Sequence, residues 1–531
     1  MGWLSVLLVG LSASVHAARR TPMDRPNPPV VQSDRVEVAV SRRDEWVVAP
    51  AGESGVVLIG TDSRGAAWTM VGYSADFQER WSASWQTDDR RMKLVDWTVE
   101  GDTLWVVLQR PKKSSVTLLQ VDLRGTEAGT VTAHEASSPV RLGLAESLAV
   151  VNDDVYVWAS LRRQKPAPGT EGVLLRVDGA QHKAEPVALA EAVNARKAEI
   201  QRVVPDDDSG VVKVALATHR RRVREVHAVS VREGQVVDAR TLAPPADGSH
   251  NLLMAQRVHT GRADLMVGTY ASGAKGQAAQ GLFVSALDAS GTELWRRTTS
   301  FSDLDRFFDY LPKRRQDRVE SRAARKKNRG ADLKLQVMLN LHDVVEQDGR
   351  FLVIGEAYHP EYQVQQRTVT VVQNGVTTTQ TETVQVFVGY RTTHAVVVAL
   401  DAEGRRVWDA SFEVGNILSR QVEDQVRVSV DGDRVTMVYA HDGKVFSKVA
   451  RADGMVEEEK HAQRAASEDG GKVKRGVESH TEHWYGDRFL VYGKETVKGG
   501  EEGRHKVFAF TSFASAPVVM TGTLVEDSVS E

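Results

Sequence analysis

The sequence has no cysteine among its 531 residues. Disulfide bonds, thiol catalysis, thiolate metal sites, cysteine-linked haem and a lipid-modified cysteine are therefore excluded. Exported proteins often use disulfides, but a chain with 41% apolar residues has enough material for a core that needs none.

The chain also has little net charge, a formal −3 at pH 7. No overall attraction to nucleic acid or to an acidic membrane follows from so small a value, so we expect no nucleic-acid partner. Beyond the N-terminus, no stretch has the roughly 20 apolar residues of a membrane-spanning helix, so we expect no transmembrane segment. Gly-x-Ser-x-Gly, phosphate-loop and His-Glu-x-x-His motifs are absent, so no motif assigns a catalytic residue.

The first residues have the order of an export signal. An apolar run at residues 3–11 leads to Val15-His16-Ala17, which places small side chains at the positions a signal peptidase requires. We expect a signal peptide over residues 1–17, cleaved near Ala17, and a secreted or periplasmic mature protein; the alternative is an ordinary hydrophobic N-terminus. Four prolines in residues 18–35 predict an extended lead-in.

From residue 36 onward, short apolar runs of period two alternate with turns rich in Gly, Asp and Asn, and helical periodicity is almost absent. Eight such runs recur roughly every 45–55 residues, with one longer gap, and each belongs to a unit that predicts a four-stranded meander. A single four-stranded sheet cannot cover both of its faces, whereas radial stacking of such sheets covers them. The sequence therefore predicts an all-β fold, a β-propeller over residues 36–531.

We count about eight blades. Their units begin near residues 36, 92, 147, 198, 250, 337, 420 and 476. Seven blades is the alternative, if the strand at 35–40 completes the last blade and two units merge. Two sandwich domains are a further architecture compatible with the pattern.

One hairpin sequence occurs twice, at residues 288–295 and 401–408. Each copy has an Asp, a Gly three residues later and a Trp four residues after that, and residues 74–81 are a degenerate copy without the Gly. The Trp falls on the last strand of its unit, where a large flat ring can pack against the next blade. The predicted blade-packing residues are Trp81, Trp295 and Trp408.

This hairpin resembles the repeat of quinoprotein-type (PQQ-like) β-propellers, whose blades carry Ala-x-Asp-x-x-x-Gly-x-x-x-Trp. The resemblance covers two good blades and one degenerate blade and implies the fold. The enzymes of that family also share an adjacent-cysteine pair and a calcium site; this chain has no cysteine and no evident calcium set, so we expect no cofactor and no metal. The segments 355–362, 389–397 and 400–413 are also similar to stretches in uncharacterised exported bacterial propeller proteins.

Residues 301–336 interrupt the repeat with good helix formers. From Lys313 to Arg329 the segment holds nine Lys or Arg and two acidic residues. It predicts one or two short helices that either bind an anionic partner or form a solvated face while the apolar start docks on the propeller rim. The candidate partner-binding residues are Lys313, Arg314, Arg315, Arg325, Lys326 and Lys327.

Residues 362–390 predict a second insertion, a long β-hairpin. Asn374-Gly375 is a strong type I′ turn signal, and Thr and Val alternate on both sides of it. Because an isolated two-stranded ribbon is marginal in water, we expect this hairpin to rest on a neighbouring part of the disc or on a partner.

A polar and aromatic cluster is predicted at the foot of this hairpin. Carboxylate, imidazole and phenol groups together suit either acid–base chemistry or a metal, or else a hydrogen-bonded ring that anchors the insertion. The candidate residues are Glu356, Tyr358, His359, Glu361, Tyr362, Tyr390 and His394.

Two functions of different classes remain open. The first is a non-catalytic, exported, monomeric propeller that binds a protein or glycan partner in the bacterial envelope. The second is an exported hydrolase or lyase with its site in the central funnel. Convergent ionisable groups in the funnel would favour the enzyme, whereas a funnel filled by Val and Thr would favour the binding protein, which is the function we expect.

Overall fold

A computed structural model describes residues 28–516, apart from the segments 42–43, 63, 125–128, 163–171, 221–222, 260–263, 274–275, 277, 331–332, 336, 343, 348, 374–375, 433, 452–459, 468–469 and 500–502. The expected signal peptide at 1–17, the lead-in up to residue 27 and the turn at Asn374-Gly375 lie outside the described residues. No helix in the described part of the chain is long and apolar enough to cross a membrane.

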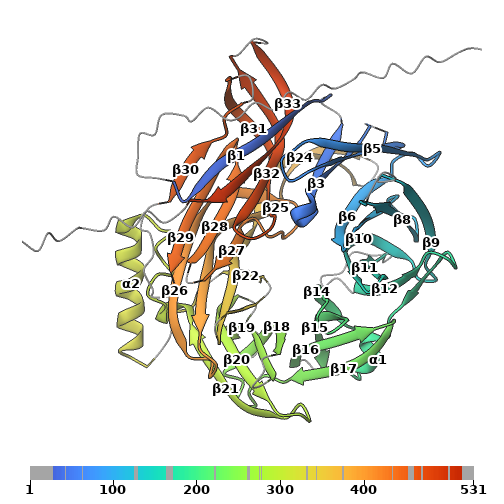
Figure 1. Cartoon of the computed structure of the whole chain (residues 1–531). Helices are drawn as coiled ribbons and strands as arrows, with labels where there is room; N and C mark the ends of the chain where they lie inside the picture. Colours follow the sequence, from blue (N-terminus) through green and yellow to red (C-terminus); the bar gives the residue numbers. More distant parts are fainter. Residues whose placement is uncertain are drawn as a thin grey trace, which may run out of the picture.

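The described strands form a ring of eight antiparallel blades (Figure 1). Seven blades have four strands, and blade 6 has five because β22 and β23 both pair with β24. Blades 2 and 3 touch at their outer strands through a single parallel pair, Ser137 with Lys183, and so form one continuous sheet. Within blades 1 to 7 the strands follow one another from the axis outward, as the meander pattern predicts. The fold is an all-β propeller.

The first four blades have these bounds. Blade 1 has β2 (Glu45–Pro50), β3 (Val56–Thr61), β4 (Ala67–Tyr73) and β5 (Glu79–Gln86), and blade 2 has β6 (Lys93–Glu100), β7 (Thr103–Gln109), β8 (Ser115–Asp122) and β9 (Val131–Ser137). Blade 3 has β10 (Leu142–Val151), β11 (Asp154–Leu161), β12 (Gly172–Asp178) and β13 (Lys183–Pro186), and blade 4 has β14 (Glu199–Asp206), β15 (Val211–Arg220), β16 (Val223–Arg232) and β17 (Gln235–Leu242).

The other four blades complete the ring. Blade 5 has β18 (His250–His259), β19 (Asp264–Ser272), β20 (Ala279–Leu287) and β21 (Glu293–Ser300), and blade 6 has β22 (Met338–Leu341), β23 (Val345–Gln347), β24 (Arg350–Gln373), β25 (Val376–Leu400) and β26 (Arg406–Ser419). Blade 7 has β27 (Arg427–Asp431), β28 (Arg434–His441), β29 (Lys444–Arg451) and β30 (His461–Arg464), and blade 8 has β31 (Lys472–His483), β32 (Arg488–Lys498), β33 (Arg504–Ser515) and β1 (Val30–Ala39). Short helices are η1 (Gly52–Ser54), α1 (Leu189–Ala192) and η2 (Phe301–Asp303), and the long helix is α2 (Lys313–Lys327).

The N-terminal strand β1 closes the ring as the outermost strand of blade 8, paired antiparallel with β33. The ring therefore has eight blades, and the N-terminal strand closes it. We expected closure by this strand only in the seven-blade alternative. The first unit starts at Glu45 and not near residue 36, because Val36 and Val38 of β1 pack on Phe508 and Phe510 in the last blade. The strand also starts earlier than the lead-in predicted, at Val30, whose side chain is fully buried.

The repeated Trp side chains occupy equivalent places on the outermost strands of blades 5 and 6. Trp295 lies directly across from Ala286, and Trp408 lies across from Ala399, so each large ring covers a small residue of its own blade. Each ring also belongs to the apolar interface with the following blade. A Cβ added at Gly404, in the hairpin of blade 6, would lie 3.3 Å from the Trp295 ring, so this glycine permits the close approach.

Trp81 repeats the arrangement in blade 1, where it lies across from Gly72. The hairpin of that blade has Phe77 where the other copies have glycine, and Phe77 adopts a left-handed φ of 58°. This conformation is strained for a bulky residue. The strain is offset because Phe77 is fully buried between blades 8 and 1, stacked at 5.5 Å on Trp484.

The helical insertion packs on blades 5 and 6 through its apolar residues, and α2 lies at the outer edge of the disc (Figure 1). Its apolar start, Phe301 and Phe307, is buried in the interface of these two blades. The backbone N–H groups of Asp305 and Arg306 donate to the two oxygens of Asp409 on β26, at 3.0 and 2.7 Å. The insertion is thus anchored through its apolar start and this carboxylate.

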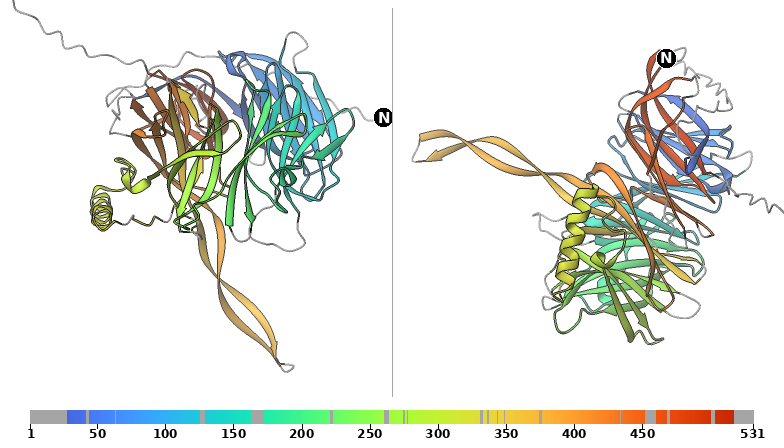
Figure 2. Two further views of the ribbon diagram at one scale, coloured as in Figure 1. Left: turned by 90° about the horizontal axis from the view of Figure 1, so that it is seen from below. Right: turned by 90° about the vertical axis from the view of Figure 1, so that its left-hand side faces the viewer.

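The hairpin insertion continues β24 and β25, the second and third strands of blade 6, as a long two-stranded ribbon. Figure 2 shows that the ribbon projects away from the disc, so it does not rest on a neighbouring part of the disc, the first of the two supports that we expected; support by a partner stays a prediction. Its pairing is regular from Tyr362 with Phe387 out to Gln373 with Val376, so cross-strand hydrogen bonds hold it together. Tyr362 and Val364 near its root remain exposed, at 55% and 66%.

Candidate functional site

Two cavities border β14, the innermost strand of blade 4. One lies among the innermost strands of blades 3 to 6, and the other lies between blades 4 and 5. The larger, of about 760 Å³, is on the face from which the ribbon rises, and we call it the ribbon-side cavity. The smaller, of about 310 Å³, is near the turns that join the first and second strands, and we call it the far-side cavity. Arg202 on β14 lines both, so this side chain marks the boundary between them.

The ribbon-side cavity combines aromatic and charged walls. Tyr390 packs edge to face on Tyr358 and on Phe387, at 5.6 and 5.0 Å, so the ribbon root forms one side. Burial raises the pKa of Tyr358 to about 12, so its hydroxyl stays protonated at neutral pH. On the other side Arg224 pairs with Glu199 at 3.2 Å.

Several residues that line this cavity carry polar atoms whose hydrogen bonds are incomplete. Buried polar atoms normally have a partner, and each exception needs an explanation such as a bound water, ion or ligand. Among the described residues the unpaired buried atoms here are Ser147 Oγ, Trp158 Nε1, Gln201 Oε1 and Arg224 Nε. The cavity is therefore not a funnel in which every buried polar atom is hydrogen-bonded and side chains fill the space.

A histidine and two carboxylates lie at the boundary between the cavities. His342 Nε2 lies 2.9 Å from Glu356 Oε1 and 3.4 Å from Asp424 Oδ1. His342 follows β22, Glu356 lies on β24 and Asp424 lies in the loop before β27, so blades 6 and 7 meet here. We call these three residues the polar floor of the ribbon-side cavity, because Asp424 lines that cavity while His342 and Glu356 are buried beneath it.

The polar floor is held by further hydrogen bonds. Asn340 Nδ2 donates to Asp424 Oδ1 at 2.7 Å, and Arg202 donates to Asp424 Oδ2 at 3.4 Å. The backbone N–H of Val426 donates to Glu356 Oε1 at 2.8 Å. The other oxygen, Glu356 Oε2, has no hydrogen-bond partner in the described part of the chain.

Charges set the ionisation of these groups. Burial pushes the pKa of His342 down, but the carboxylates of Asp424 and Glu356 outweigh burial, and the pKa is raised above its usual value. Burial likewise pushes the pKa of Asp424 up, but His342, Arg202 and Arg427 outweigh it, and the pKa is lowered.

Nearby on the axis, Asp96 of β6 accepts the backbone N–H groups of Trp97 and Leu148. Burial nevertheless raises its pKa to about 6. Arg427 and Glu482, from blades 7 and 8, form an ion pair at 2.8 Å.

The structure divides the predicted polar cluster between the two faces of blade 6. Glu356 lies opposite Ala395, and His394 lies opposite Ala357, so Glu356 and His394 project from opposite sides of the sheet. His394 is fully buried under the helical insertion, stacked at 3.7 Å on Tyr310. Burial lowers its pKa to about 3, so this histidine is neutral.

The remaining cluster residues lie at the ribbon root. Tyr358 and Tyr390 line the ribbon-side cavity. His359 is exposed, Glu361 pairs with Arg391, and Tyr362 packs on Phe387 at 5.7 Å. The root therefore contributes aromatic walls to the cavity, while its charged groups lie outside the cavity lining.

The candidate basic residues lie on α2 and are exposed. Lys327 pairs with Asp303 at 2.7 Å and Lys313 pairs with Asp317 at 3.3 Å. Ala323 is buried and belongs to the apolar cluster that the insertion shares with blades 5 and 6. Arg314, Arg315, Arg325 and Lys326 therefore present a basic outer surface, away from both cavities.

Sequence reasoning did not identify His342, Asp424 or Arg202. They come from three blades and are not close together in the sequence. A usable signal exists, because each lies on or beside the innermost strand of its unit, where a polar side chain interrupts the apolar pattern near the axis.

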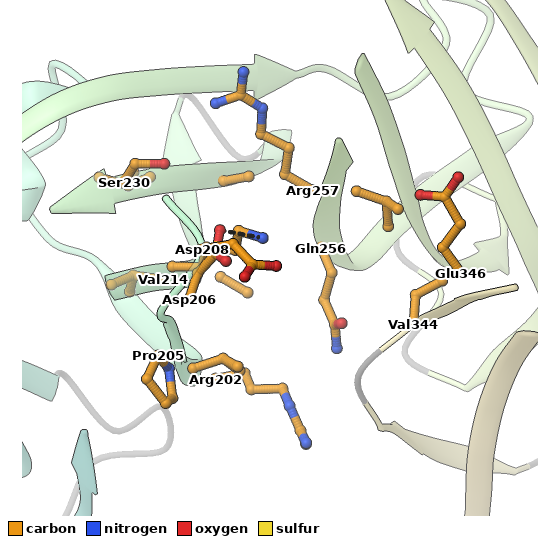
Figure 3. A pocket seen from close by; sticks show the side chains of 16 residues that line it. Arg202, Pro205, Asp206, Asp208, Val214, Ser230, Gln256, Arg257, Val344 and Glu346 are labelled. Atoms are coloured by element: carbon orange, nitrogen blue, oxygen red, sulfur yellow. Dashed lines mark ion pairs between the residues drawn. The ribbon is translucent and has the colours of Figure 1, made fainter. Parts of the chain in front are cut away.

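The far-side cavity is smaller and its acids lie apart (Figure 3). Figure 3 shows Asp206 and Asp208 on one side and Glu346 on the other. Asp206 pairs with Lys213 at 2.7 Å and accepts the Ser209 hydroxyl. This cavity contains no group comparable to the polar floor among the described residues.

No family model and no curated protein matches the chain. Solved structures resemble it at low identity. A dihydro-heme d1 dehydrogenase, NirN, in complex with DHE shares 13% identity over 90% of this chain and 78% of that chain, with a TM-score of 0.41. The Dos1 propeller shares 10% over 80% and 92%, with a TM-score of 0.35. The β-propeller domain of the Trilobed protease from Pyrococcus furiosus shares 9% over 80% and 94%, with a TM-score of 0.34.

Proposed function

We propose that this chain is an exported propeller protein that binds a protein or glycan partner through its ribbon face. The observation that carries the proposal is the ribbon-side cavity, with its aromatic root and its incompletely bonded lining atoms. Aromatic and arginine side chains dominate the energetics of binding surfaces, and buried polar groups without partners are completed when a ligand arrives.

The ribbon root supports the same function. Phe387 is 43% exposed and Tyr362 is 55% exposed, side by side at the mouth of the cavity. Large exposed aromatic side chains grouped beside a cavity are typical of an interaction site. A partner that covered them would also stabilise a ribbon that is otherwise marginal in water.

Export and kinship with quinoprotein-type exported propellers are parts of the proposal that rest on sequence. The signal at residues 1–17 supports an envelope or extracellular location. The Asp-Gly-Trp hairpins and their equivalent places in blades 5 and 6 support the kinship.

A hydrolase or lyase is the second candidate, favoured by one observation. Four carboxylates, those of Glu146, Glu199, Glu423 and Asp424, line the ribbon-side cavity, and burial raises the pKa of Glu146, as acid–base catalysis requires. Glu199, however, is engaged by Arg224. The variant Glu146→Gln tests this candidate, since loss of the acid–base group would abolish turnover in an enzyme.

The proposed function is tested by capture from an envelope extract on immobilised full-length protein, with bound proteins and glycans both quantified. The test variants are Phe387→Ala and a ribbon truncated by replacing residues 366–383 with Asn-Gly, which keeps the root. Glu346→Ala, exposed at the far-side cavity, is the matched control.

We expect Phe387→Ala to lose the partner at least about 10-fold, since a central aromatic contact carries 1.4 kcal/mol or more. Glu346→Ala should leave capture unchanged. A partner retained by Phe387→Ala and lost by Glu346→Ala would contradict the proposal. The truncated ribbon shows whether the distal ribbon adds contacts beyond the root.

A further inference from the structure

The polar floor brings together three side chains that suit a divalent metal ion. Candidate ligand atoms of His342, Glu356 and Asp424 all lie within 4.8 Å of one another. Zn²⁺ binds imidazole nitrogen and carboxylate oxygen at about 2.0–2.2 Å, so neighbouring ligands of a tetrahedral ion lie about 3.4 Å apart. The distances from His342 Nε2 to the two carboxylates, 2.9 and 3.4 Å, are close to this spacing.

A second, independent observation is the unpaired oxygen of Glu356. The side chain is 2% exposed, yet Oε2 has no hydrogen-bond partner in the described part of the chain. A carboxylate oxygen buried without a donor is costly, because its hydration is lost and not replaced. A proton on His342 would supply a donor to Oε1 only, whereas a cation beside the carboxylate would satisfy both oxygens.

The surroundings hold the proposed ligands in place. The two carboxylate oxygens of Asp424 have different partners. Oδ2 accepts a hydrogen bond from Arg202, whereas Oδ1 lies near His342 and accepts a hydrogen bond from the side-chain amide of Asn340. The N–H of Val426 fixes Glu356. Such outer hydrogen bonds to metal-binding carboxylates orient the ligands and tune their affinity.

We propose that His342, Glu356 and Asp424 bind one divalent transition-metal ion, with Zn²⁺ as the expected occupant, at the floor of the ribbon-side cavity. One nitrogen and two carboxylate groups favour Zn²⁺ over Mg²⁺, which prefers an all-oxygen, octahedral shell. Three protein ligands leave a position for a further ligand, and Asp424 lines the cavity, so the partner could supply that ligand. This site is independent of whether the protein is a binding protein or an enzyme.

The test is Zn²⁺ titration of the full-length, untagged protein by calorimetry after chelator treatment. We expect one Zn²⁺ per chain, with Glu356→Gln and Asp424→Asn each weakening affinity at least about 10-fold, the lower end of what even outer-shell changes cost. The matched controls are His359→Ala and Glu361→Gln, exposed or outside the cavity on the same blade, and both should bind as the wild type does. Absence of Zn²⁺ binding to the wild type would overturn the proposal. So would ligand variants that both bind Zn²⁺ as tightly as the wild type does.

A spectroscopic measurement on the wild type keeps the proposal falsifiable if a ligand variant fails to fold. X-ray absorption of the Zn²⁺-loaded protein should show a shell of nitrogen and oxygen at about 2.0–2.2 Å with one imidazole. Two or more imidazoles would place the metal on other histidines and overturn the assignment.

Discussion

The two faces of blade 6 both bury a histidine, and the two histidines behave oppositely. On the face toward blade 5 and the helical insertion, His394 is surrounded by aromatic rings, and burial lowers its pKa to about 3. On the face toward blade 7 and the axis, His342 is surrounded by carboxylates, which raise its pKa against burial. The same residue type is therefore a packing element on one face and an electrostatic centre on the other.

This difference separates structure from function within one sheet. The face toward blade 5 and the helical insertion, here the insertion face, surrounds His394 with aromatic rings and anchors the insertion. The face toward blade 7 and the axis is here the axial face. The axial face gathers charge beside a cavity. Among the described residues each face leaves one atom of this comparison unpaired, His394 Nε2 among aromatic rings and Glu356 Oε2 among charged groups. We therefore expect changes on the insertion face to alter stability, and changes on the axial face to alter binding. Four variants test that division, and their expected effects on stability decrease from the first to the last.

Phe307→Ala should have the largest effect on stability. Phe307 is 1% exposed, stacked on Phe301 at 4.8 Å and packed edge to face on His394. Removing a buried Phe side chain costs about 3–5 kcal/mol. Chemical denaturation should show this loss, and limited proteolysis should cleave near α2, while Zn²⁺ affinity of the folded protein stays unchanged. A weakened Zn²⁺ affinity would mean that the two faces are coupled.

His394→Phe should remove a pH dependence of stability. The folded pKa of His394, about 3, lies below the unfolded value of 6.5, so its contribution is complete above pH 6.5 and is lost as the pH falls toward 3. The wild type should therefore lose about 3 kcal/mol more than the variant between pH 6.5 and 4, at 1.36 kcal/mol per pH unit. Urea unfolding at several pH values measures this. His359→Ala is the exposed control; an unchanged profile in His394→Phe would show that His394 is not the group responsible.

Glu356→Gln should have a moderate effect on stability in the absence of metal. The amide keeps an acceptor for the Val426 N–H but weakens the charged hydrogen bond to His342, worth about 1.5–3 kcal/mol. Thermal unfolding in the presence of chelator should show this loss, and added Zn²⁺ should stabilise the wild type but not the variant. Equal stabilisation of both proteins by Zn²⁺ would contradict the division between the faces.

Truncation of the ribbon, by replacing residues 366–383 with Asn-Gly, should have the smallest effect. The distal ribbon projects from the disc (Figure 2). The side chains at residues 366–369 and 379–383 are mainly exposed. The unfolding free energy of the disc should change by no more than about 0.5 kcal/mol, as for other surface changes. A larger destabilisation would show that the distal ribbon contributes to folding of the disc.

Much of this architecture was predictable from sequence. Alternating apolar runs and a repeat of four strands predicted the propeller, and seven of the eight unit starts lie within a few residues of the first strand of a blade. The exception is the first unit, because the sequence of β1 does not show that its partner is β33, at the other end of the chain.

The candidate site was predicted only in part. Glu356 and Tyr358 were selected because polar residues cluster at the ribbon root, but sequence proximity could not place His394 on the other face. The face on which His394 lies is set by the register between β24 and β25, because Ala357 and not Glu356 lies opposite His394. The partners of Glu356 come from the loops that follow β22 and precede β27, and their convergence is set by how the blades stack around the axis.

The most direct measurement is a crystal structure of the Zn²⁺-soaked protein with anomalous data at the zinc edge. We predict one strong peak bounded by His342, Glu356 and Asp424, with no comparable peak near His394. If the polar floor holds no zinc peak at a saturating Zn²⁺ concentration, and His342 still contacts Glu356 directly, the assignment of a metal centre to the axial face of blade 6 is contradicted.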